Sequence, residues 1–431
     1  MKKKILATVL VGALAASMFA ACGNNASDAN AKAESTAKEA EAEVEKAVEE
    51  AVAEEVVEEA ATEAAVEEAV EEAVEEAVAE EVVKEAVAGD IGGKTIGYYM
   101  DAADDYYKCA YEVFMDLVAD NEATADWEVV DKVGQGTTQE QLQAVEDFIT
   151  AGVDAIIVVQ NSPEITAECI TKANEAGIPY FAMTHVPSVP AGGELAGFVG
   201  YDFVDCGIYA GEDALAHGVT KLINIEGKLG QGSAAAQTLG FLKAYEDAGM
   251  DIGGTADDVA TNKTAGGEDL QIVQWASGEW WSEPAKKAMA DAITALGADG
   301  WDGAYVQNDE MMDGAIQAIE EAGLNPSDYW LGSSNGKEKS WVWVEEGKET
   351  MDVNQTPSLE GDVMYQIVCN YFATGESLYI IPYVTPFNTD DIADLTLIPY
   401  DHTAYMEIRD EINTDITSDD FGDATDLISW G

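Results

Sequence analysis

Arginine is almost absent from this chain of 431 residues, since Arg409 is the only one. Because arginine is the usual bidentate partner of carboxylates and phosphates, its scarcity disfavours a strongly anionic ligand. Aspartate and glutamate number 84 against 21 lysines and arginines, which gives a formal net charge of −63. This charge excludes the basic surface that nucleic-acid binding requires, and it disfavours electrostatic docking on anionic lipid.

Metal-ligating residues are also few. The chain has three histidines (His185, His217 and His402), without a His-Glu-x-x-His motif or a cluster of cysteines. A catalytic zinc site is therefore not expected, and we expect no cofactor. Apart from Cys22, the cysteines lie far apart within apparent helices, at positions 109, 169, 206 and 369. We expect buried thiols, although export of the protein would leave a disulfide possible.

The N-terminus has the features of an export signal. Three lysines after Met1 precede an apolar run from Ile5 to Phe19, which is too short for a stable transmembrane helix. The sequence Phe19-Ala20-Ala21-Cys22-Gly23 resembles a bacterial lipoprotein cleavage box, apart from Phe19, where the pattern prefers leucine. The resemblance implies a signal peptide over 1–21 and a lipid-modified Cys22, and thus an extracytoplasmic, membrane-anchored lipoprotein at the cell surface or in the periplasm.

Residues 22–92 are rich in alanine, glutamate and valine and repeat the unit Val-Glu-Glu-Ala, with valines at 66, 70, 74, 78 and 82. A spacing of four overshoots a helical turn by about 40° per step, so the valines wind around a helix and form no coiled-coil seam. We expect an acidic stalk, helical or disordered, between the anchor and the next domain. A helix that binds a partner protein is the alternative.

From Lys94 onward, apolar strands alternate with amphipathic helices. The run Ala155 to Val159 is apolar throughout, as in a strand buried on both faces of a sheet. Regular alternation with short loops predicts parallel sheets covered by helices. The pattern restarts at Leu222 and continues for a similar length, which predicts an α/β fold of two similar lobes.

A short strand at Ala304 to Val306 runs directly into Asn308 and Asp309, where a helix begins. Asn and Asp are natural N-cap residues, but the carboxyl ends of parallel strands are also where open α/β sheets bind ligands. Both interpretations are open from this stretch alone. In the context of a two-lobed chain, we expect Asn308 to face a cleft and Asp309 to cap the helix.

Aromatic and amide side chains follow several other predicted strands. Tyr106 and Tyr107 follow the first strand, and Trp280 and Trp281 follow the strand that ends near Trp275. Around a cleft, such rings would offer flat platforms for the C–H faces of a sugar. Residues that could then bind hydroxyl groups stand at further strand ends, namely Asn161, Asp202, Asn308, Asn335 and Gln355.

The segment Gly332-Ser333-Ser334-Asn335-Gly336 fits the Gly-x-Ser-x-Gly pattern of serine hydrolases, with Asp390, Asp391 and His402 downstream. No glycine-rich oxyanion segment precedes it. An exported hydrolase is therefore an alternative to a binding protein.

Over residues 94 to 400 the order and spacing of several motifs resemble the sugar-binding proteins of ABC transporters, of the ribose- and galactose-binding type. The motifs are Asp104-Asp105-Tyr106-Tyr107, 152–157, 176–179, Gly200-Tyr201-Asp202, Gly240-Phe241, 308–311 and Asn354-Gln355. The resemblance implies two Rossmann-like lobes joined by three crossings, near 198–202, 355–358 and 383–387. Lobe 1 would comprise 93–199 and 357–383, and lobe 2 would comprise 200–356 and 384–431.

The same resemblance implies a ligand-binding set. Tyr106, Tyr107 and Trp280 would enclose a sugar ring, and Asn308 and Gln355 keep the family's amides. Charged groups of the family are replaced here by Thr184-His185, Gln237 and Asn335, while Asp104 precedes the tyrosine pair. These replacements favour a small neutral polar ligand but leave its identity open.

We therefore expect a monomeric, non-catalytic solute-binding lipoprotein that captures a sugar between two lobes and delivers it to an ABC permease. A sensor that serves a chemoreceptor or a histidine kinase is the alternative. Sugar-responsive repressors share this fold, but an export signal stands here where they have a DNA-binding headpiece.

Overall fold

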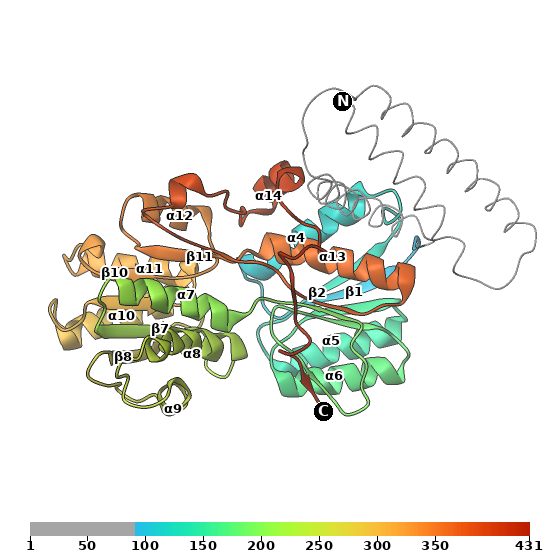
Figure 1. The fold of residues 1–431 in the computed structure, drawn as a ribbon. Coiled ribbons are helices and arrows are strands. Elements are labelled where there is room, and N and C mark those ends of the chain that lie inside the picture. The colour runs from blue at the N-terminus through green and yellow to red at the C-terminus, as the bar shows by residue number, and fades with distance from the viewer. Residues whose placement is uncertain (1–90) are drawn as a thin grey trace, which may run out of the picture. The chain divides into compact units, whose positions relative to one another are not determined.

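The computed structural model describes residues 91–431, in which two parallel-stranded sheets each carry helices on both faces (Figure 1). The expected signal peptide, the lipidation site Cys22 and all but the last two residues of the expected stalk lie outside the described residues. We call the two sheets with their helices lobe 1 and lobe 2.

The sheet of lobe 1 has the strand order β2-β1-β3-β4-β6-β12-β14, and only β14 is antiparallel to its neighbour. The strands are β1 (Thr95–Met100), β2 (Glu128–Val133), β3 (Ala155–Val159), β4 (Tyr180–Met183), β6 (Gly197–Val199), β12 (Leu378–Ile381) and β14 (Gly422–Asp423). Every residue of β3 is buried, because this central strand is covered on both faces, as its apolar run predicts.

Two pairs of helices cover this sheet (Figure 1): α4 (Asp105–Asp120) with α13 (Pro357–Thr374), and α5 (Thr138–Ala151) with α6 (Pro163–Glu175). The pair α4 and α13 approaches closely at Gly361. A Cβ atom there would lie 2.2 Å from the carbonyl oxygen of Ala110, so only glycine permits this approach of the two helices.

The sheet of lobe 2 has the order β8-β7-β9-β10-β11-β13, in which β13 is antiparallel to β11. The strands are β7 (Lys221–Glu226), β8 (Gln271–Ser277), β9 (Gly303–Val306), β10 (Trp330–Gly332), β11 (Met351–Asn354) and β13 (Thr385–Asn388). Apolar side chains from α7 (Phe203–Ala216) and α8 (Gly232–Asp247) pack on one face, and those from α10 (Ser282–Leu296) and α11 (Asp309–Glu321) pack on the other. The remaining elements are α9 (Ala256–Asn262), η1 (Pro326–Asp328), α12 (Glu338–Glu345) and η2 (Ile392–Asp394).

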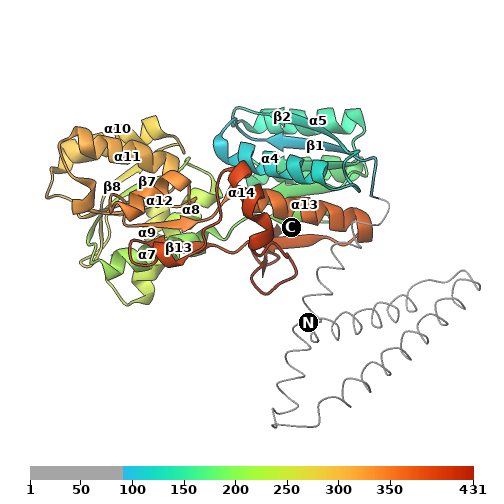
Figure 2. The same ribbon diagram turned by 90° about the horizontal axis from the view of Figure 1, so that it is seen from above.

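Four segments connect the lobes, one more than the resemblance implied: 200–202 between β6 and α7, 355–356 between β11 and α13, 382–384 between β12 and β13, and 395–401 between η2 and α14 (His402–Ile408). Figure 2 shows the elements of each lobe gathered on their own side of these connections. In both sheets the strand order reverses next to the first strand, between β1 and β3 in lobe 1 and between β7 and β9 in lobe 2. Ligands of open α/β sheets bind at such switch points, beyond the carboxyl ends of the strands.

The C-terminal part of the chain corrects one predicted boundary. The sequence assigned 384–431 to lobe 2, but the chain returns to lobe 1 after η2. There α14 (His402–Ile408) packs against α4, β14 pairs with β12, and β15 (Ser429–Trp430) pairs with β5 (Ser188–Val189). The short helix η3 (Arg409–Glu411) follows α14, and the Arg409 guanidinium binds the buried carboxylate of Asp362 on α13. Pairing of β14 with β12 satisfies backbone groups at an edge of the sheet.

The cysteines of the described region are buried thiols, as the sequence predicts: Cys109, Cys169, Cys206 and Cys369 are all unpaired. They lie on four different helices, α4, α6, α7 and α13. Within residues 91–431, no helix has the length and the apolar character that a membrane crossing would require.

Candidate functional site

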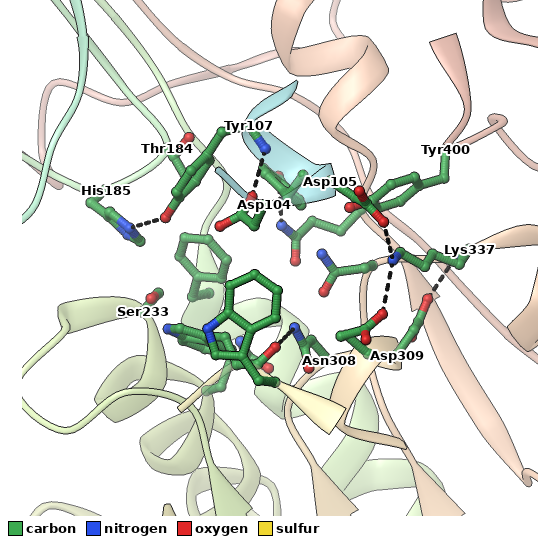
Figure 3. Close-up of a pocket in the computed structure, with 18 of the residues that line it drawn as sticks. Asp104, Asp105, Tyr107, Thr184, His185, Ser233, Asn308, Asp309, Lys337 and Tyr400 are labelled. Atoms are coloured by element: carbon green, nitrogen blue, oxygen red, sulfur yellow. Dashed lines mark hydrogen bonds and ion pairs between the residues drawn. The ribbon is translucent and has the colours of Figure 1, made fainter. Parts of the chain in front are cut away.

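A cavity of about 140 Å³ lies between the lobes, lined by loops that follow strands of both sheets. In Figure 3, Asp104, Tyr107, Thr184 and His185 of lobe 1 face Ser233 and Asn308 of lobe 2 across it. Eleven of the thirteen residues predicted to bind the ligand line this pocket: Asp104, Tyr106, Tyr107, Thr184, His185, Gln237, Trp280, Trp281, Asn308, Asn335 and Gln355.

The wall from lobe 1 is built at the start of α4. Asp104 is the N-cap residue, and its Oδ1 accepts a hydrogen bond of 2.9 Å from the amide of Tyr107. The rings of Tyr106 and Tyr107 meet edge to face, with centroids 6.0 Å apart. The Tyr107 hydroxyl lies 3.2 Å from Nε2 of His185, and the Tyr106 hydroxyl accepts from Nε2 of Gln355 at 3.1 Å. The cap thus fixes the start of the helix and with it the two aromatic rings.

The wall from lobe 2 contains Asn308, which caps α11 and also lines the pocket. Its Oδ1 caps α11 by accepting from the amide of Met311 at 2.9 Å, and its Nδ2 donates to the carbonyl oxygen of Trp280 at 3.4 Å. The prediction that Asp309 caps this helix is wrong. Asp309 is buried in the first turn, where its carboxylate accepts from Ser333 Oγ at 2.9 Å and from the Lys337 amide at 2.6 Å.

Gln237 presents its amide group to the pocket in a fixed orientation. Its Oε1 accepts from the Tyr305 hydroxyl at 2.9 Å and from Ser334 Oγ at 3.1 Å. Since both donors lie behind Oε1, the Nε2 donor is left to face the pocket. Ser334 is itself fully buried and also donates to the Gln307 carbonyl, while His402 lies against Glu112 in lobe 1. The serine, aspartate and histidine of the hydrolase alternative are therefore not assembled.

Two polar atoms in the pocket wall are buried without a hydrogen-bond partner among the described residues. They are Oγ of Ser233, a residue that is 5% exposed, and Nδ1 of His185. An unsatisfied buried polar atom costs about 1–3 kcal/mol unless a bound water or a ligand supplies the missing hydrogen bond.

Backbone strain is concentrated at the pocket. In the described region five non-glycine residues have a positive φ, and three of them line the cavity: Thr184 (68°), Trp280 (67°) and Asn335 (115°). A β-branched residue is strongly disfavoured in this conformation. Thr184 is held there by the hydrogen bond of 3.1 Å from its Oγ1 to Glu360. Strain of this kind accumulates at ligand-binding sites.

The charged residues of the pocket are predominantly acidic. Asp104, Asp105, Asp309 and Glu310 line it, and Lys337 is the one cationic side chain among its described lining residues. Burial raises the pKa of Asp104 to about 7, and the hydrogen bond from the Tyr107 amide opposes this rise. Burial also raises the pKa of Asp309 to about 7.

His185 contributes no positive charge to the pocket at neutral pH. Burial, and to a lesser degree the charge of Lys228, lowers the pKa of His185 to about 4. Its imidazole is therefore neutral at pH 7 and can serve a ligand as a hydrogen-bonding group. Among residues 91–431, no group of three or more His, Cys, Asp or Glu side chains is arranged to hold a metal ion.

Two predicted residues lie outside the pocket lining because their side chains have other partners. The Nδ2 of Asn161 donates to both carboxylate oxygens of the buried Asp101. The carboxylate of Asp202 caps α7, where it accepts from the amide of Val204 at 2.8 Å. Polar residues at strand ends thus divide between ligand-facing and structural positions.

Sequence reasoning did not include eight lining residues in the binding set: Ala103, Asp105, Phe203, Ser233, Asp309, Glu310, Lys337 and Tyr400. Several of these adjoin predicted residues in the same turn and could have been added on that basis. Tyr400 had no such signal, because it comes from the segment that returns to lobe 1, where its ring lies 6.1 Å from that of Tyr106.

Comparison with known proteins identifies the family. The model of the periplasmic binding protein domain matches residues 96–377. The galactofuranose-binding protein of Escherichia coli (strain K12) is 26% identical over 234 residues, which are 53% of this chain and 67% of that protein. A putative rhizopine-binding protein of Rhizobium meliloti is 27% identical over 265 residues, which are 61% of this chain and 79% of that protein.

Solved structures show the same fold. A galactofuranose-binding protein superimposes with a TM-score of 0.60 at 22% identity, covering 70% of this chain and 96% of that one. An ABC transporter solute-binding protein from Bacillus halodurans C-125 with bound myo-inositol gives a TM-score of 0.59 at 22% identity, covering 71% and 98%. These relatives are binding proteins and not enzymes. The chain belongs to the periplasmic binding protein family, in the type I form found in sugar-binding proteins of ABC transporters, as its sequence motifs implied.

Proposed function

We propose that residues 91–431 bind a polyhydroxylated ligand of the size of a sugar in the pocket between the lobes and deliver it to an ABC permease. A lipid on Cys22 would anchor the protein to the membrane, and the acidic stalk would separate the anchor from the two lobes. The protein would act as a monomer, by binding and closure and without chemical change of the ligand.

The two unpartnered buried atoms, Ser233 Oγ and His185 Nδ1, are the observation that carries this proposal. Ser233 and His185 line the same cavity as Gln237. A ligand with several hydroxyl groups both donates and accepts hydrogen bonds, so it would satisfy the serine, the imidazole and the amide together. An apolar ligand would leave all three unsatisfied in a closed site, at a cost of about 1–3 kcal/mol for each group.

Aromatic rings supply the remaining surface of the pocket. Tyr106 and Tyr107 lie in the wall from lobe 1, and Trp280 lies in the wall from lobe 2. The flat faces of such rings suit the C–H faces of a hydroxylated ring. The relatives named for galactofuranose and rhizopine, and the structure with bound myo-inositol, are in line with a ring of this type.

Contacts between the lobes support a mechanism of hinge closure. Nζ of Lys228 in lobe 2 donates to the carbonyl oxygen of Gly136 in lobe 1 at 3.0 Å. On another side of the pocket, Nζ of Lys337 lies 3.7 Å from the carboxylate of Asp105. Since both contacts join residues of different lobes, they would form when the lobes close and would break when they open.

A thermal-shift screen against monosaccharides, oligosaccharides and cyclic polyols tests ligand binding, because a ligand that binds only the folded state raises the melting temperature. We expect one or more members of the panel to stabilise the protein, and Ser233→Ala to weaken that stabilisation. If no member stabilises the protein, the proposal is overturned.

The anchor requires a separate experiment. Full-length protein expressed in a bacterial host that processes lipoproteins should be recovered in the membrane fraction, and Cys22→Ser should release it from that fraction. Recovery of both forms in the soluble fraction would contradict the lipid anchor and leave the ligand proposal unaffected.

A further inference from the structure

Two of the four carboxylates that line the pocket, Asp104 and Asp309, have no cationic side chain in contact among the described residues. Lys337 is the one lysine among its described lining residues, and its ammonium group lies 3.3 Å from Glu310 and 3.7 Å from Asp105. The carboxylate of Asp309 accepts hydrogen bonds from Ser333 and from the Lys337 amide. Asp105 and Glu310 thus share a cation, and both carboxylate oxygens of Asp309 accept a hydrogen bond from the protein.

Asp104 is the fourth. Its Oδ1 accepts from the Tyr107 amide at 2.9 Å, and its Oδ2 has no hydrogen-bond donor among residues 91–431. Figure 3 shows Asp104 in the wall from lobe 1, on the side of the pocket opposite Asn308. The only arginine, Arg409, binds Asp362 and does not line the pocket. No cationic side chain of the described residues is thus in contact with the free oxygen of Asp104.

Asp104 is half-buried, so its free oxygen is only partly hydrated, and a cation with hydrogen-bond donors is a favourable partner for such a carboxylate. Burial accordingly raises the pKa of Asp104 to about 7. The surroundings suit a cation on the ligand, because the tyrosine rings that follow Asp104 and the Trp280 ring opposite offer electron-rich faces. No arginine lines the pocket, which disfavours an anionic ligand. The carboxylate of Asp104 is therefore available to a cationic group of the ligand.

We propose that the ligand is a polyhydroxylated ring that carries one protonated primary amine, an amino sugar or an aminocyclitol, and that Asp104 binds its ammonium group. This inference rests on the proposed function and revises the sequence-based expectation of a neutral ligand. In this arrangement the ammonium group would donate to Oδ2 of Asp104. The hydroxyl groups of the ring would form hydrogen bonds with Ser233, His185 and Gln237.

Matched ligand pairs test the inference by calorimetry and thermal shift at pH 7. The amines are D-glucosamine, D-galactosamine and scyllo-inosamine, and each is compared with the compound in which a hydroxyl or an N-acetyl group replaces the amine. We expect at least one amine to bind about tenfold more tightly than its neutral counterparts, since hydrogen bonds to charged groups are about twice as strong as neutral ones. Equal or tighter binding of the neutral members overturns the inference and leaves the proposed function intact. Failure of every member to bind overturns the inference, whereas the proposed function is overturned only if the wider panel of sugars and polyols fails as well.

Two substitutions assign the effect to Asp104. Asp104→Asn and Asp104→Ser both remove the charge and keep an N-cap side chain, so α4 should remain folded. We expect both variants to lose most of the preference for the amine over its hydroxyl counterpart. Asp401→Asn is the control, because Asp401 caps α14 in the same way and does not line the pocket. A preference that persists in both Asp104 variants contradicts the assignment.

Discussion

Substitutions of Asn308 should separate its contact with the helix from its contact with the ligand. Asn308→Ala removes the hydrogen bond from Oδ1 to the Met311 amide, and loss of an N-cap costs about 0.5–2 kcal/mol. A unit of the size of residues 91–431 unfolds with an entropy of about 0.7 kcal/mol per degree. The melting temperature without ligand should therefore fall by about 1–3 °C.

The same substitution also removes Nδ2, which donates one N–H to the Trp280 carbonyl and keeps a second N–H on a residue that lines the pocket. A neutral hydrogen bond contributes about 0.5–1.5 kcal/mol, so affinity should fall about 2- to 10-fold. Asn308→Asp distinguishes the two effects, because aspartate caps as well as asparagine but cannot donate. We expect the Asp variant to keep the melting temperature within about 1 °C and to lose at least as much affinity as the Ala variant.

Differential scanning calorimetry of the free protein and titration with the tightest ligand of the screen measure the two quantities. Thr137→Ala is the matched control, because Thr137 caps α5 and does not line the pocket. It should lower the melting temperature by a similar amount without a change in affinity. Wild-type affinity in Asn308→Asp would refute the ligand contact, and an unchanged melting temperature in Asn308→Ala would refute the cap.

Three further predictions concern stability, stacking and pH. Arg409→Gln leaves the fully buried carboxylate of Asp362 without its counter-charge, which should lower the free energy of unfolding by about 3–5 kcal/mol in urea denaturation; a loss below about 1 kcal/mol would contradict this. Trp280→Ala should lower affinity about tenfold and remove much of the ligand-induced change in fluorescence, and unchanged affinity would exclude Trp280 from the site. Burial raises the pKa of Glu360 to about 8, so the folded state holds a proton that the unfolded state releases. Stability should therefore fall as pH rises from about 5 to about 8, and Glu360→Gln should reduce this slope in melting curves; an unchanged slope would show that Glu360 does not carry it.

Local patterns in the sequence predicted most of the residues that line the pocket, because the ends of strands can be recognised from the sequence. Apolar runs such as Ala155–Val159 locate the buried strands, and the polar and aromatic residues that follow such strands meet at one edge of a parallel sheet. The tyrosine pair, Trp280 and Asn308 were identified in this way, and all of them line the pocket. Asn161 and Asp202 also follow predicted strands, but their side chains bind Asp101 and the start of α7 instead. The position of a residue at a strand end does not determine the partner of its side chain.

The sequence by itself determined the two-lobed α/β fold, because hydrophobic periodicity and turn residues are local properties that repeat along the chain. It also determined that the pocket would lack arginine. Only the tertiary structure decided that Tyr400 joins the pocket, that the C-terminal residues return to lobe 1, and that one carboxylate oxygen of Asp104 has no donor among the described residues. Those features depend on contacts between residues far apart in the sequence, such as Tyr106 with Tyr400 and Lys337 with Asp105. The spacing of residues along one chain does not specify such contacts.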